Sequence, residues 1–175
     1  NTESWVVAHQ RTIVDTYGAR HPGVRAQPCV EFGRLEPHCI PFGVPQFVPD
    51  QSLNTPATKD TFFRDIVTAV HRQGGLVSWN HPFGYSEGPL LSPADQVTKR
   101  RAVFSALWAN NLYGGDILEV GYALRGEVGM DAHLGLWDTF SRRAHFLTGN
   151  GVNDDHSAFS WSTLRNGFLT GIWSS

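Results

Sequence analysis

The chain has 175 residues, of which 41% are hydrophobic and 17% are charged, and its formal net charge is −2. This length is sufficient for one domain with a full hydrophobic core, and the composition excludes a disordered chain. No apolar run is long enough to cross a bilayer, so no membrane partner is predicted. The small negative charge gives no electrostatic reason to expect general nucleic-acid binding.

Strands alternate with helices along the sequence, which predicts an α/β fold with a parallel sheet or a barrel. Apolar spacing, capping residues and glycines predict, in chain order, a helix over 2–20, strands over 24–32 and 37–42, a helix from 60 or 61 to the glycines at 74–75, a strand over 76–80, a helix from 92 to 111, a strand over 116–122, a helix over 131–143, and strands over 145–148 and 166–173. The segment 84–91 is expected to be a flexible loop. Because a helix precedes the first strand, we expect residues 1–175 to be a single domain that is a fragment of a longer protein.

The two cysteines are Cys29 and Cys39. Their short separation permits a disulfide, which would indicate an oxidising compartment and export, and the alternative is a pair of reduced, buried thiols. The sequence leaves both alternatives open and does not otherwise predict a localisation. Neither cysteine belongs to a CxxC pair, so a zinc–thiolate site is not expected.

Carboxylate and imidazole side chains occur at, or close to, the ends of four predicted strands. They are Glu31, His81, Glu119 and the pair Asp154 and His156. In parallel α/β folds, ligands bind at the carboxyl ends of the strands. Oxygen and imidazole ligands without thiolates suit Zn, Mn or Fe, so the pattern predicts a divalent-metal site.

The sharpest signal is the pair Asp154 and His156. A two-residue step in an extended loop places both side chains on one side, whereas Asp155 should point the other way. The alternative is a turn in which Asn153 and Asp154 bond their own backbone.

The remaining candidates each have an ordinary structural alternative. His81 could be satisfied by a backbone carbonyl. Glu119 lies in an apolar strand, where a carboxylate is costly unless it is paired or bound to a cation, and its alternative is a solvent-facing edge strand. Glu31 has a similar alternative. His38 could face Glu31 across a hairpin or be a surface turn residue.

The other histidines give weaker signals. His9 would be a ligand only if residues 5–8 formed a strand, and the helical interpretation of that segment is better. The rest are interpreted as structural or surface residues: His21, His71, His133 and His145.

Four segments resemble, in order, the motifs of the PHP (polymerase and histidinol phosphatase) superfamily. Residues 74–82, GGLVSWNHP, look like its "GG–apolar strand–HP" motif. Cys29-Val30-Glu31 followed by His38 resembles its "G-x-E … H" segment, residues 116–120 resemble its "gIEv" strand, and residues 147–157 resemble its closing "G-S-D-x-H" motif. The matches span residues 29 to 157.

The resemblance implies a distorted (β/α)7 TIM-like barrel and a multinuclear metal centre. It also implies hydrolysis of small phosphomonoesters or nucleotides by a metal-activated water. The implied metal ligands are Glu31, His38, His81, Glu119, Asp154 and His156, with Asp154 and His156 also catalytic. Arg125, which follows the Glu119 strand, could contact the phosphate of the substrate. The family's opening H-x-H strand and the D-H pair after it are missing here, so the expected barrel is incomplete at its N-terminal side.

Two other functions stay open on the sequence. A metal-dependent amidohydrolase would require a modified lysine or an H-x-H strand as ligands, and neither Lys59 nor Lys99 is predicted at a strand end. A barrel that binds metal or a partner without turnover would be consistent with the missing opening motifs.

Overall fold

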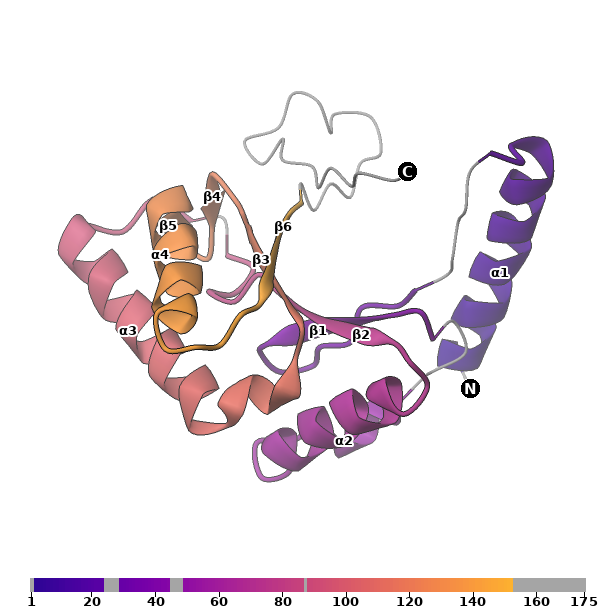
Figure 1. Cartoon of the computed structure of the whole chain (residues 1–175), viewed down its shortest axis with the longest axis horizontal. Coiled ribbons are helices and arrows are strands. Elements are labelled where there is room, and N and C mark those ends of the chain that lie inside the picture. The colour runs from indigo at the N-terminus through magenta and orange to yellow at the C-terminus, as the bar shows by residue number, and fades with distance from the viewer. Residues whose placement is uncertain (1, 24–28, 45–48, 87, 153–175) are drawn as a thin grey trace. The chain divides into compact units, whose positions relative to one another are not determined.

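The structure is a computed structural model that describes residues 2–23, 29–44, 49–86 and 88–152 (Figure 1). The chain forms two compact units, Asn1–Val77 and Ser78–Ser175.

The described residues of the first unit form two long helices and one complete strand. Its elements are α1 (Thr2–Arg20), β1 (His38–Phe42), a short 3-10 helix (Gln51–Leu53) and α2 (Lys59–His71). Helix α2 buries Phe63, Ile66 and Val70, whose three- and four-residue spacing forms one apolar face. The helix contacts β1 and thereby covers one part of the sheet.

The second unit contains most of the sheet. Its elements after β2 (Leu76–Asn80), which crosses the boundary between the units, are α3 (Pro93–Ala109), a 3-10 turn (Asn111–Gly114), β3 (Ile117–Gly121), β4 (Leu124–Arg125), β5 (Val128–Gly129), α4 (Met130–Ser141) and β6 (Thr148–Gly151). Helix α3 begins where the Ser92 hydroxyl caps it by accepting from the Asp95 backbone N–H. Helices α3 and α4 lie side by side, and α4 packs against β3 (Figure 1).

The main sheet has four strands in the order β1-β2-β3-β6, and β4 and β5 form a separate antiparallel pair. Strands β2, β3 and β6 are parallel, with Trp79 opposite Leu118 and Leu118 opposite Gly149. The carboxyl ends of these three strands therefore share one edge of the sheet. The pairing of β3 with β6 shifts register between Glu119 and Gly121.

The expectation of a (β/α)7 barrel is wrong. The described residues form an open α/β sheet of four strands plus the two-stranded pair, and β1 and β6 are the outer strands of the larger sheet. A barrel requires these outer strands to pair with one another or with further strands. Local sequence periodicity identified the βα units but contains no information on closure.

Most predicted helices and strands are found, with α1 and β2 at the predicted bounds. The predicted strand over 24–32 is not: residues 29–31 are not a strand, and Phe32 makes only an isolated antiparallel bridge to Cys39. The strand expected over 145–148 begins three residues later, at Thr148, because the chain after α4 turns back through Ala144 (φ 62°). The predicted strand over 166–173 lies outside the described residues.

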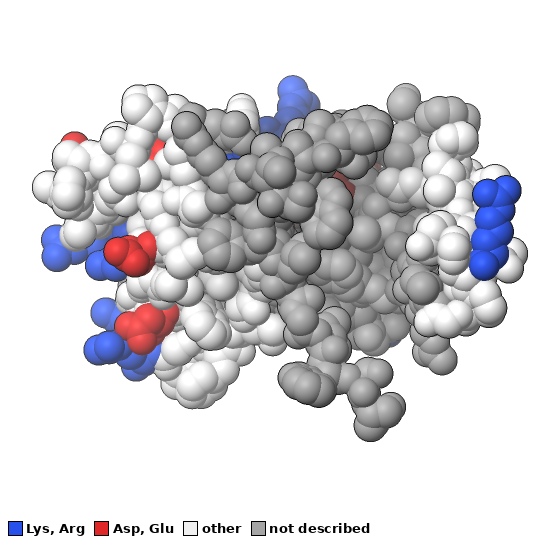
Figure 2. All heavy atoms as spheres, turned by 90° about the horizontal axis from the view of Figure 1, so that it is seen from above, with Lys and Arg blue, Asp and Glu red and all other residues white. Residues whose placement is uncertain are grey.

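None of the described helices combines the length and the hydrophobicity that a bilayer crossing requires. On the face shown in Figure 2, basic and acidic side chains are interspersed where both are visible.

Candidate functional site

The first unit brings Glu31 and His38 together. Phe32 and Cys39 exchange two backbone hydrogen bonds of 2.7 Å, which align the segments that carry the two side chains. The Oε1 atom of Glu31 lies 3.6 Å from Nδ1 of His38. Glu31 and His38 are therefore diagonal neighbours across the bridge, and His38 begins β1, so the alternative of a surface turn residue is wrong for His38.

Gly33 leaves room for this imidazole. A Cβ atom at Gly33 would lie 2.0 Å from Cδ2 and 2.1 Å from Cγ of His38. The other ring nitrogen of His38, Nε2, lies 3.8 Å from Oε1 of Glu36. The imidazole is therefore held between two carboxylates and against a glycine backbone.

The geometry of this Glu/His group could hold a metal ion. Two ligand atoms at about 2.1 Å from one tetrahedral ion lie roughly 3.4 Å apart. The observed 3.6 Å between Glu31 and His38 is close to that separation. A carboxylate and a neutral imidazole suit Zn, Mn or Fe, so the donor chemistry also fits.

The second unit contains His81 and Glu119, and the Glu119 side chain contacts the backbone of His81. Glu119 lies on the inner strand β3 and is only 5% exposed, so the alternative of a solvent-facing edge strand is wrong. Its Oε2 atom accepts a hydrogen bond of 2.7 Å from the backbone N–H of His81. His81 itself is buried and has φ 26°, an uncommon conformation for a residue with a side chain.

Tyr122 is a further polar residue at this point, and the sequence did not identify it. Its hydroxyl donates to the same Oε2 atom of Glu119 at 2.5 Å. A regular strand would place residues 119 and 122 on opposite faces. The register shift after Glu119 accompanies their convergence.

His133, which was interpreted as structural or surface, is completely buried beside this group. Its Nε2–H donates to the backbone carbonyl of Arg125 at 3.3 Å, and its ring contacts those of Phe83 and Tyr122. Burial lowers the pKa of His133 to about 4, which the hydrogen bond to Arg125 opposes only in part. The imidazole is therefore neutral at pH 7 and has a structural role.

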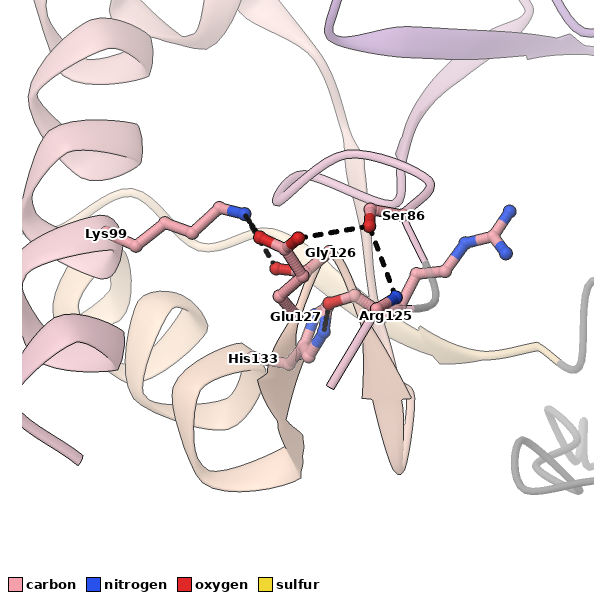
Figure 3. Close-up of polar contacts among 7 residues, drawn as sticks. Ser86, Lys99, Arg125, Gly126, Glu127 and His133 are labelled. Carbon is pink, nitrogen blue, oxygen red and sulfur yellow. Dashed lines mark hydrogen bonds and ion pairs between the residues drawn. The ribbon is translucent and has the colours of Figure 1, made fainter. Parts of the chain in front are cut away.

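The hairpin β4–β5 is braced by α3 and by the segment after His81 (Figure 3). Lys99 donates to the carbonyl oxygen of Gly126 at 2.8 Å and pairs with Glu127 at 3.4 Å. Ser86 bonds both residues of the turn, accepting from the Gly126 N–H at 2.8 Å and donating to Glu127 at 3.2 Å. Figure 3 shows the Arg125 side chain pointing away from the Lys99–Glu127 pair. The segment 84–91, expected to be flexible, is thus tied to the hairpin through Ser86.

Both cysteines are free thiols, but Cys29 is exposed and only Cys39 is buried, so the alternative of two reduced, buried thiols is correct for Cys39 alone. Cys39 is completely buried, and burial, with a smaller effect of the Glu31 charge, raises the pKa of its thiol far above the usual value. A neutral thiol is a poor metal ligand, so the cysteines do not add to the Glu/His group.

Two predicted ligands lie outside the described residues: Asp154 and His156, together with their neighbours Asn153 and Asp155. His9 lies within α1, in agreement with the helical interpretation.

Comparison of the chain with protein-family models, with curated proteins and with solved structures gives no match. A functional assignment therefore depends on the residues themselves.

Proposed function

We propose that this protein is a metal-dependent hydrolase that acts on small phosphomonoesters or nucleotides. The observation that carries the proposal is the Glu31–His38 pair, whose 3.6 Å separation suits two ligands of one ion. The ordered likeness to PHP motifs supports the same reaction class and does not depend on a closed barrel.

The proposed ligands come from both units. Within the first unit the proposed ligands of a Zn, Mn or Fe ion are Glu31 and His38. Within the second unit they are His81 and Glu119. Asp154 and His156 complete the proposed set on sequence grounds alone. Carboxylates and imidazoles in this number are sufficient for more than one ion.

A bound divalent ion would supply Lewis acidity, activating a water molecule and polarising the phosphoryl group. In this proposal, Asp154 orients the attacking water and accepts its proton. Arg125 contacts the phosphate, for which a planar guanidinium is well suited. The brace from Lys99 to Gly126 and Glu127 would keep the neighbouring Arg125 backbone in place.

An amidohydrolase of the lysine-bridged type is disfavoured by the positions of the two lysines. Lys59 is the first residue of α2, and Lys99 lies within α3 and is engaged with the hairpin. Neither residue lies at the carboxyl end of a strand of the main sheet.

The proposal is tested by measuring metal content and p-nitrophenyl phosphate hydrolysis for the wild type, His38→Ala and His156→Ala. His71→Ala is the control, because His71 is an exposed residue in the last turn of α2. We expect both ligand variants to lose bound metal and activity and the control to keep both. No bound metal in the wild type would refute the proposal. Bound metal without hydrolysis of any phosphate ester would instead establish a non-catalytic binding protein.

A further inference from the structure

Glu119 receives two hydrogen bonds on one oxygen, and both donors are buried. The Tyr122 hydroxyl lies 2.5 Å from Oε2 of Glu119, and the His81 backbone nitrogen lies 2.7 Å from it. Tyr122 and His81 are 0% and 3% exposed. The two donors compensate for the loss of water around the buried Glu119 carboxylate.

The Tyr122 hydroxyl is itself held in a fixed place. The Tyr122 ring lies 5.1 Å from the ring of His133, which in turn lies 4.7 Å from the ring of Phe83. His133 is also bonded to the backbone of Arg125. Close packing of these buried rings leaves the phenol little freedom to swing, so its hydroxyl is a directed donor.

We infer that Tyr122 is a positioning residue that orients the Glu119 carboxylate for a divalent cation. The hydroxyl fixes the rotation of the carboxylate about its Cγ–Cδ bond and so sets the direction in which Glu119 presents its second oxygen. Because the same Oε2 atom bonds the backbone of His81, the orientation of Glu119 is coupled to the position of a second proposed ligand. This inference rests on the proposed function, since it assigns Tyr122 to the same metal centre.

The test uses Co²⁺ as the probe, because its visible absorption bands report the geometry of its ligands and its affinity is measured independently of catalysis. Partners that orient a metal ligand typically contribute 10–100-fold to metal affinity. We expect Tyr122→Phe to bind Co²⁺ about 10–100-fold more weakly than the wild type and to shift the absorption bands. Tyr113→Phe is the matched control, since Tyr113 is a buried tyrosine of the same unit that packs against Trp79, and its affinity should stay at the wild-type value.

A second variant, Tyr122→4-aminophenylalanine, keeps a weaker donor in the same place and should bind Co²⁺ with intermediate affinity. If Tyr122→Phe fails to fold by circular dichroism, this variant decides: binding weaker than wild type supports the inference, and wild-type binding overturns it. Equal affinity and equal spectra for the wild type and a folded Tyr122→Phe would overturn the role of Tyr122 and leave the proposed function standing. Absence of Co²⁺ binding by the wild type would overturn both.

Discussion

Substituting Gly33 by alanine tests the Glu31–His38 pair without removing either ligand. The new methyl group would lie 2.0 Å from Cδ2 of His38, and the shortest ordinary contact is 3.4 Å. The imidazole must therefore move by about 1.4 Å to restore van der Waals contact. Metal–ligand distances tolerate about 0.2 Å, so the displaced ring is lost as a ligand. Loss of a residue that only orients a metal ligand typically lowers metal affinity about 10–100-fold. We therefore expect Gly33→Ala to lower the affinity for Zn²⁺ by about that factor or more.

The assay is equilibrium Zn²⁺ binding by calorimetry, with circular dichroism to verify the fold. Gly23→Ala is the matched control, because a Cβ atom at Gly23 has nothing within 4 Å. If Gly33 acts through His38, the substitution should have no further effect in a His38→Ala background. Wild-type affinity in Gly33→Ala, or an equal loss in both backgrounds, would refute the reasoning.

Three further predictions concern stability, each measured by urea denaturation. His133 has a folded-state pKa of about 4, below its usual value of 6.5, so only the unfolded chain binds this proton between those values. The free energy of unfolding should therefore fall by roughly 3 kcal/mol from this group as the pH decreases from 6.5 to 4. His133→Gln should remove this part of the pH dependence. An unchanged pH dependence in the variant would contradict the lowered pKa of His133. Gly126→Ala places a Cβ atom 2.2 Å from the backbone oxygen of Phe83 at φ 60° and should lower the free energy of unfolding by roughly 3 kcal/mol or more. The control Gly74→Ala, at φ 75° with nothing within 4 Å, should lower it by only about 1–2 kcal/mol. Equal losses for the two variants would exclude an effect of the clash. Ser92→Ala removes the cap of α3 and should lower the free energy of unfolding by about 1 kcal/mol. The control Ser105→Ala, at an exposed position of the same helix, should be close to neutral. Similar values for the two variants would show that the cap does not contribute to stability.

The elements that the sequence predicted well have local causes. Helix α3 begins as expected because Ser92 caps it and Pro93 occupies its first position. Strand β2 has the predicted bounds because two glycines separate a short apolar run from α2. The hairpin β4–β5 was missed because its turn is Gly126-Glu127, with both residues at φ near 60°, whereas the usual signal is an Asn or Asp before the glycine.

The candidate site was predictable where local patterns suffice. The flanking apolar residues left Glu119 with two alternatives, a paired or cation-bound carboxylate in an apolar strand and a solvent-facing edge strand, and its burial excludes the second. Its partner Tyr122 was not predictable, since strand alternation separates residues 119 and 122 and only an irregularity in β3 accompanies their approach. The sequence left open whether His133 is structural or at the surface, because its aromatic neighbours come from two other segments of the chain.

The metal-site hypothesis does not require a closed barrel. Ligands gather at strand ends because parallel strands present their carboxyl ends at one edge, and this requires parallel pairing rather than closure. Strands β2, β3 and β6 have that pairing. Strand β2 ends directly before His81, β3 carries Glu119, and β6 ends two residues before Asn153 in the sequence. Glu119 is already joined to the backbone of His81 by a 2.7 Å hydrogen bond, which ties the ends of two of these strands together. The part of the hypothesis that concerns His81, Glu119, Asp154 and His156 therefore depends on the direction of three strands and not on a closed barrel. The variant His156→Ala tests the one strand end whose side chains rest on sequence alone.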